Sequence, residues 1–216
     1  LHQRLKQRYP DVPLCIMGHS MGSFLTRTYL IRYPGTVKAA VIMGTGWQPQ
    51  AAITGGLALA NAIAAVSGEN ATSELVTELA FGSYNKLFAP NRTKVDWLSA
   101  DESNVDDYIA DPLCGVDATV GLFRQMLHGI RFNQRQSHLR QMDREMPVLF
   151  VAGDKDPVGS CGKGVRQTYD AFRAAGMRDC TLKLYPGLRH EILNEKAYTA
   201  DITKNIEAWL LSRLEK

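Results

Sequence analysis

The chain has 216 residues, of which 45% are hydrophobic and 22% are charged, and its formal net charge is +3. These values are ordinary for one soluble globular domain, or for one domain with an inserted subdomain. Lysine and arginine are scattered along the chain, so the charge gives no indication of a nucleic-acid-binding surface. The most apolar segment, residues 53–66, is interrupted by two glycines and an asparagine, and we expect no integral membrane segment.

The cysteines are spread along the chain. Cys15, Cys114, Cys161 and Cys180 form no CxxC pair, and no histidine lies at metal-ligand spacing from any of them. This arrangement favours free thiols in a reducing compartment over a disulfide framework or a zinc site. The cytoplasm is the default expectation for localisation.

The first 46 residues alternate between helical and strand patterns. Residues 1–9 have apolar side chains spaced four apart, which is typical of one helix face. Apolar runs at residues 14–17 and 37–43 end at glycines, and short runs of this kind are typical of strands buried on both faces of a parallel sheet. A helical pattern over residues 26–32 lies between these two predicted strands.

The pattern then changes. Helical spacing dominates residues 47–141, and strand patterns return at residues 148–152 and 181–185. A helical pattern over residues 169–175 lies between these strands, and an amphipathic helix follows them. One face of that last helix holds Tyr198, Ile202, Ile206, Trp209 and Leu210.

This order of elements predicts an α/β fold, in which a helical cap is inserted into a mostly parallel sheet. We expect the core to comprise residues 1–46 and 142–216, and the cap or lid to comprise residues 47–141.

Residues 18–22, Gly-His-Ser-Met-Gly, match the G-x-S-x-G pattern of a nucleophile elbow. A strand pattern enters the motif and a helical pattern leaves it, as this turn requires. The serine of such a turn takes a strained backbone conformation, and side chains two residues before and after it would collide, which explains the glycines. We predict that Ser20 is a nucleophile and that the backbone N–H of Met21 stabilises an oxyanion.

A serine nucleophile needs a base, and the base needs an acid that orients it. In α/β-hydrolases the chain order is serine, acid, histidine. Of the 5 histidines, His190 alone follows the last predicted strand, so it is the expected base. Asp154 and Asp156 both follow the preceding strand. Asp156 is favoured as the acid because it is placed to reach over the sheet, whereas Asp154 is expected to cap the turn.

Three stretches of the chain carry a family resemblance: GHSMGS from Gly18, VAGDKDPVG from Val151 and LYPGLRHEILNE from Leu184. They resemble the monoacylglycerol lipase and lysophospholipase-like group of α/β-hydrolases, which is also grouped with serine aminopeptidases. The cap stretch FGSYNKLFAPNRTKVDWLSADESNVDDYIADPLCG resembles the lid of a bacterial-type subgroup, so the resemblance covers almost the whole chain. It implies an α/β-hydrolase fold with Ser20, Asp156 and His190 as a catalytic triad.

The same resemblance implies several strands before the elbow strand, and an early loop that supplies a second oxyanion N–H. Neither is recognised in this chain, so we expect an earlier segment of the same fold, on this or another polypeptide, to flank residues 14–17. Without it that strand would be an unpaired edge, and the loss of one oxyanion donor would cost about 10²–10³ in rate.

These expectations describe a serine carboxylester hydrolase that acts through an acyl-enzyme and needs no metal or organic cofactor. A lipid-like ester of the monoacylglycerol or lysophospholipid class is the expected substrate. Trp47 follows the second strand at the end of the sheet where α/β proteins bind ligands, and we predict that it binds substrate together with His19.

The other apolar side chains of the cap are expected to form mainly the cap's own core, with a minority facing the substrate. They include Ile53, Leu57, Leu59, Phe81, Leu122, Phe123 and Leu127. A second group, Arg92, Thr93, Asp96 and Trp97, is expected to form a structural network in the cap.

Two alternative functions stay open. An amidase or aminopeptidase of the same fold would need acidic residues around a substrate amine. Asp101, Glu102, Asp106 and Asp107 are available, although a solvated acidic turn is the simpler interpretation. A non-catalytic binding protein on this scaffold would show the loss of a triad residue, and all three are present.

Overall fold

A parallel sheet of four strands, in the order β1-β2-β3-β4, forms the centre of the computed structural model, which describes residues 1–214. The strands are β1 (Cys15–His19), β2 (Ala39–Met43), β3 (Val148–Gly153) and β4 (Cys180–Tyr185). Every neighbouring pair is parallel. The four strands predicted from the sequence are confirmed, although β1 continues through Gly18 instead of ending before it.

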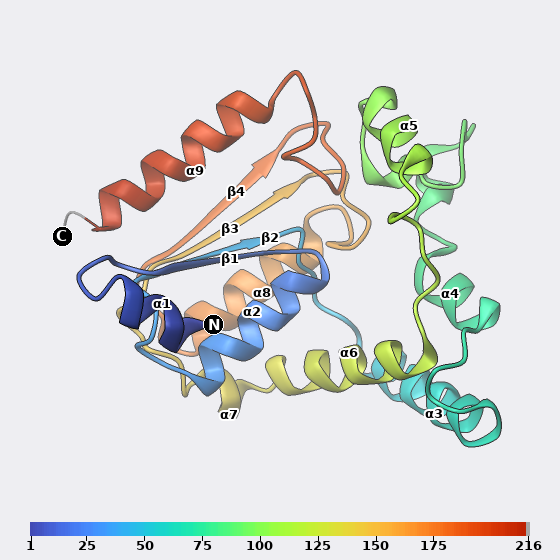
Figure 1. Cartoon of the computed structure of the whole chain (residues 1–216), viewed down its shortest axis with the longest axis horizontal. Coiled ribbons are helices and arrows are strands. Elements are labelled where there is room, and N and C mark those ends of the chain that lie inside the picture. The colour runs from blue at the N-terminus through green and yellow to red at the C-terminus, as the bar shows by residue number, and fades with distance from the viewer. Residues whose placement is uncertain (215–216) are drawn as a thin grey trace.

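Helices cover both faces of this sheet (Figure 1). On one face α2 (Met21–Arg32) and α8 (Lys163–Ala174) pack against alternate strand residues such as Ile42 and Phe150. On the other face α9 (Thr199–Leu214) packs against the residues between them, such as Val41 and Val151. Because side chains alternate along a strand, uninterrupted apolar runs supply both of these cores.

The remaining helices are α1 (His2–Arg8), which precedes β1, and those between β2 and β3. The latter are α3 (Gln50–Ser67), α4 (Glu74–Phe81), α5 (Glu102–Ala110), α6 (Val120–Asn133), α7 (Gln136–Leu139) and the 3₁₀ turns η1 (Asn85–Phe88) and η2 (Asp96–Leu98).

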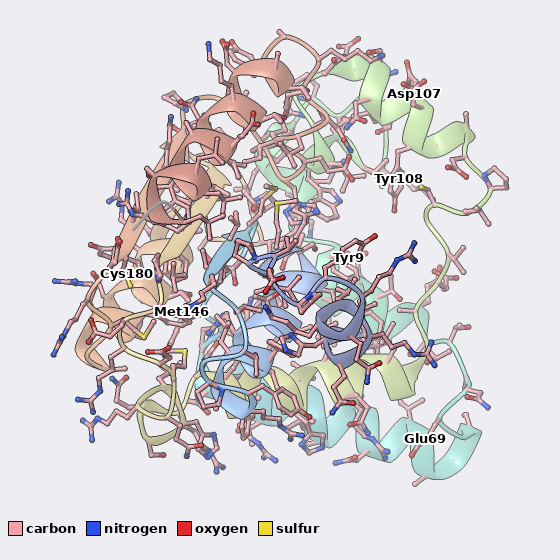
Figure 2. All side chains as sticks on the ribbon, turned by 60° about the vertical axis from the view of Figure 1, so that its left-hand side comes forward. Tyr9, Glu69, Asp107, Tyr108, Met146 and Cys180 are labelled. Carbon is pink, nitrogen blue, oxygen red and sulfur yellow. The ribbon has the colours of Figure 1, made fainter. Side chains whose placement is uncertain are left out.

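Helices α3 to α6 form a cap beyond the carboxyl ends of the strands (Figure 1). α3 packs along α6, and α6 packs along α2 of the core. Figure 2 shows Asp107 and Tyr108 on α5 at one end of the cap and Glu69, which follows α3, at the other. The cap therefore extends across the whole edge of the sheet where parallel strands end.

A buried arginine joins the base of the cap to the core. Arg27 of α2 is fully buried; its Nη1 donates to the carbonyl oxygen of Gly46 over 2.9 Å, and its Nη2 donates to that of Asn133 over 3.5 Å. Burial lowers the pKa of Arg27 to about 9. Beside it, the side-chain amide of Asn133 at the end of α6 donates to the carbonyl oxygen of Phe24 over 3.0 Å. These bonds fix α6, and with it the cap base, on α2.

Helix α3 is unusually apolar for a helix with so much exposed surface. Its 18 residues have a mean hydropathy of 1.3, and only 17% of this stretch is buried. By length and composition alone it would be able to cross a membrane, so the expectation that the chain has no integral membrane segment stays a prediction. In the structure, Ile53 and Leu57 on one side of α3 pack against Ile130 of α6.

Strand β1 lies at the edge of the described sheet and pairs with β2 along one side. Met17 near its end is 55% exposed. That an earlier segment of the fold pairs with this strand stays a prediction.

The aromatic contact between sheet and helix generates a stability prediction. Phe172 of α8 is fully buried and meets Phe150 of β3 edge-on, with ring centroids 5.1 Å apart. We expect Phe172→Ala to lower the free energy of unfolding by about 3–5 kcal/mol, because it removes buried area and leaves a cavity. Leu211→Ala on the exposed side of α9 is the control, and urea denaturation is the measurement. Equal losses in the two variants would contradict this packing.

Candidate active site

The turn between β1 and α2 holds Ser20 in a strained backbone conformation, with φ 54° and ψ −122°. Few residues other than glycine have a positive φ. The N–H of Ser20 donates to the carbonyl oxygen of Met43 in β2 over 3.1 Å, which fastens the turn to the sheet. Met21 is the first residue of α2, so its N–H has no partner within the helix and lies at the positive end of the helix dipole.

The two glycines of the motif have different surroundings. A Cβ at Gly18 would lie 2.2 Å from the carbonyl oxygen of Gly22 and 2.3 Å from Oγ1 of Thr26, so only glycine fits. A Cβ at Gly22 would meet nothing within 4 Å. The steric explanation predicted from the sequence is therefore confirmed for Gly18 and wrong for Gly22.

Two loops bring His190 and Asp156 together at the same edge of the sheet. Nδ1 of His190, after β4, lies 3.0 Å from each carboxylate oxygen of Asp156, after β3. The histidine is 2% exposed and the aspartate is fully buried. Oδ1 of Asp156 also accepts the N–H of Val158 over 2.9 Å. The carboxylate is thus held in place by its own loop and orients the imidazole.

The neighbouring Asp154 has a different position. Its Oδ1 accepts the N–H of Gly187 over 2.8 Å, so it fastens the turn after β4 to the end of β3. Gly153 permits the close crossing of these loops, since a Cβ there would lie 2.0 Å from the carbonyl oxygen of Leu188. The geometry therefore agrees with the sequence-based choice of Asp156 over Asp154 as the partner of His190.

Ser20 and Met21 open into a cavity of about 530 Å³ between core and cap. Six of the seven apolar cap residues singled out in the sequence line it: Ile53, Leu59, Phe81, Leu122, Phe123 and Leu127. The expectation that only a minority of them face this space is wrong, because α3 and α6 turn their shared apolar side toward the serine. Leu57 is outside the lining and packs beside it, against Ile53 and Ile130.

The two residues predicted to bind substrate lie outside this lining. The buried guanidinium of Arg27 lies 5.9 Å from the ring centroid of Trp47. The prediction that Trp47 faces the pocket is therefore wrong. His19 packs its ring against His190, with centroids 4.6 Å apart, and its Nε2 is 3.0 Å from the carbonyl oxygen of His190. It therefore contacts the histidine loop instead of the cavity.

Trp97 of η2 takes the place expected for Trp47. It lines the cavity, and its ring centroid is 5.2 Å from that of His190. Tyr84 lines the cavity beside it, and burial together with the charge of Asp156 raises the pKa of Tyr84 to about 12. The phenol therefore stays protonated and can donate a hydrogen bond into the cavity. The aromatic residues Phe81 and Tyr84, three positions apart, are a sequence signal for this wall.

Three of the four cap residues expected to form a structural network do so, whereas the fourth, Trp97, lines the cavity. The carboxylate of Asp96 accepts the N–H of Arg92 over 2.7 Å and bonds the hydroxyl of Thr93. The acidic residues considered for an amine-binding pocket lie elsewhere: Asp106 pairs with Arg92, and Asp107 pairs with Lys196. Among the residues that the structure describes, no charged side chain lines the cavity.

The different surroundings of the two motif glycines predict different effects of the same substitution. Gly18→Ala should displace the elbow and lower both the melting temperature and the reactivity of Ser20, because its Cβ overlaps backbone atoms. Gly22→Ala should fold normally, since its Cβ meets open space and alanine favours a helix by about 1 kcal/mol over glycine. Thermal unfolding and covalent labelling of Ser20 check both; equal effects of the two variants would contradict the geometry.

Comparisons with known proteins agree with this architecture. A monoacylglycerol lipase of Mycolicibacterium smegmatis is 30% identical over 209 residues, covering 95% of this chain and 65% of the relative. A monoglyceride lipase of Mus musculus is 26% identical, covering 97% of this chain and 62% of the relative. The chain thus spans less than two thirds of the length of these curated relatives.

A solved structure of a highly thermostable carboxyl esterase from Bacillus coagulans, in complex with glycerol, has a TM-score of 0.90 at 24% identity, covering 98% of this chain and 68% of that one. Such likeness confirms the predicted α/β-hydrolase fold. The profile of the family described as serine aminopeptidase, S33, matches residues 1–197. The chain therefore belongs to the serine aminopeptidase, S33, family of α/β-hydrolases.

Proposed function

We propose that the protein is a serine carboxylester hydrolase that acts through an acyl-enzyme on a lipid-like ester of the monoacylglycerol or lysophospholipid class. One observation carries the proposal: a strained serine at a helix N-terminus opens into an apolar cavity beside a buried histidine–aspartate pair. The names of the relatives, monoacylglycerol lipase and monoglyceride lipase, support the same class of substrate.

Acylation begins with His190 as general base. Because Nδ1 faces both oxygens of Asp156, the proton of the neutral ring resides on Nδ1, and Nε2 is free to accept a proton. Nε2 takes the proton of the Ser20 hydroxyl while Oγ attacks the ester carbonyl carbon. The N–H of Met21 stabilises the oxyanion that forms, and an earlier segment of the fold is expected to supply the second donor. The C–O bond to the alcohol then breaks, and His190 returns its proton to the leaving oxygen.

Deacylation repeats these steps with water. His190 takes a proton from water, whose oxygen attacks the acyl carbon, and the bond to Ser20 Oγ breaks as the serine recovers its proton. Asp156 keeps its negative charge throughout and stabilises the imidazolium. The carboxylic acid product then leaves the cavity.

The cavity favours an ester with an acyl chain over the amide alternative. A volume of about 530 Å³ is within the range of small-molecule sites, and the lining is mostly aliphatic and aromatic. An aminopeptidase would need a carboxylate to bind the substrate amine, and the described lining offers none. Besides Ser20, the lining residues with polar side-chain groups available for the head group are Gln48, Tyr84 and Trp97.

A matched pair of substitutions on α3 tests the acyl-binding role. Ala52 and Ala58 are both exposed residues of this helix, but only Ala52 lines the cavity. In the full-length protein, Ala52→Trp should lower kcat/KM for a dodecanoate ester by about 10-fold or more and leave an acetate ester almost unaffected. Ala58→Trp should change neither, as followed by hydrolysis of 4-nitrophenyl esters of increasing length.

Equal behaviour of these two variants would contradict an acyl-binding cavity.

Ser20→Ala should lower kcat for every ester on the order of 10⁶-fold, and substantial remaining activity would contradict Ser20 as the nucleophile.

A further inference from the structure

The loop that carries His190 is fastened to the cap as well as to the core. Residues 189–196 of this loop contact residues 96–107 of the cap through several hydrogen bonds. We call these two segments the clasp. The mechanism above uses His190 alone among the loop residues, so the purpose of the other contacts is open.

Glu195 is the buried centre of the clasp. Its side chain is only 3% exposed. Oε1 accepts the N–H of Ala100 over 2.8 Å, and Oε2 accepts the N–H of Asp101 over 3.0 Å. Both carboxylate oxygens are thus satisfied by cap backbone just before α5. A buried carboxylate without such partners would be costly, so the loop and this part of the cap hold one another.

Arg189 and Glu191 add contacts on either side of His190. The guanidinium of Arg189 donates to the carbonyl oxygen of Ser99 over 3.0 Å and lies 4.1 Å from the ring centroid of Phe88. The N–H of Glu191 donates to the carbonyl oxygen of Leu98 over 2.8 Å. The residues immediately before and after the histidine are therefore both bonded to cap backbone.

His190 itself lies between the two bodies. Its ring contacts Trp97 of the cap and His19 of the core. Ser20 and Asp156, with which it must align, are both carried by core loops. A separation of residues 96–107 from the core would therefore carry the histidine loop away from its partners.

We infer that Glu195 is a positioning residue. Its carboxylate bonds the histidine loop to the cap and thereby keeps His190 aligned with Ser20 and Asp156. The inference rests on the proposed function, in which His190 is the base. It makes catalysis dependent on the cap being seated on the histidine loop at the α5 end.

Kinetics of the full-length protein distinguish positioning from simple stabilisation. Glu195→Ala should lower kcat by about 10²-fold, because a displacement of about 1 Å in a catalytic group has an effect of this size. KM should stay close to its normal value, since Glu195 is outside the cavity lining. Glu195→Gln keeps the length and one acceptor oxygen, so its kcat should lie between those of the alanine variant and the unaltered protein.

Ser73→Ala is the matched control. Ser73 caps α4 in the same cap by accepting the N–H of Val76, and it does not contact the histidine loop. Its loss should lower stability and leave kcat unchanged. A normal kcat in Glu195→Ala, or an equal fall in kcat in Ser73→Ala, would overturn the inference. Absence of ester hydrolysis by the unaltered protein would instead overturn the proposed function.

Proton NMR provides a measurement that needs no turnover. The unaltered protein should show the downfield resonance of the His190 Nδ1–H bonded to Asp156. In Glu195→Gln, which should fold normally, this resonance should move upfield or broaden through exchange with solvent. In Ser73→Ala it should be retained. An unchanged resonance in Glu195→Gln together with an unchanged kcat would overturn the inference even if Glu195→Ala does not fold.

Discussion

The buried hydrogen bond between Asp156 and His190 is the constraint on which the rest of the site depends. A fully buried carboxylate needs partners, and here it has the imidazole Nδ1 and the N–H of Val158. This requirement sets the course of the loops after β3 and β4, and the close crossing at Gly153 follows from it. The parallel sheet then places these loops beside the elbow, because all its strands end at the same edge.

The cap is attached to the core at two places with different chemistry. At its base, α6 packs on α2, where buried Arg27 and Asn133 bond backbone carbonyls. At the other end, the clasp joins residues 96–107 to the histidine loop through Glu195. The apolar cavity lies between these attachments. One part of the cap therefore closes the proposed substrate site, while another part contacts the loop of His190, the proposed general base.

Much of the fold was predictable from the sequence, because uninterrupted apolar runs bounded by turns correspond to strands buried on both faces. The pairing of His190 with Asp156 followed from chain order. The residues that line the pocket were not predictable in this way. Trp47 and Trp97 are the same residue type, and only the fold of the cap decides which of them lines the cavity. Glu195 was also missed: its partners are backbone N–H groups 95 and 94 residues away, and a backbone donor leaves no trace in the sequence.

The central claim is that Ser20 is an activated nucleophile, and covalent labelling tests it most directly. The full-length protein would be treated with a fluorophosphonate, weighed intact by mass spectrometry and digested to map the adduct. The account predicts one adduct, on Ser20, which disappears in Ser20→Ala. A folded protein that takes no adduct, or takes it on another residue, would contradict the account and favour a binding protein on a hydrolase scaffold.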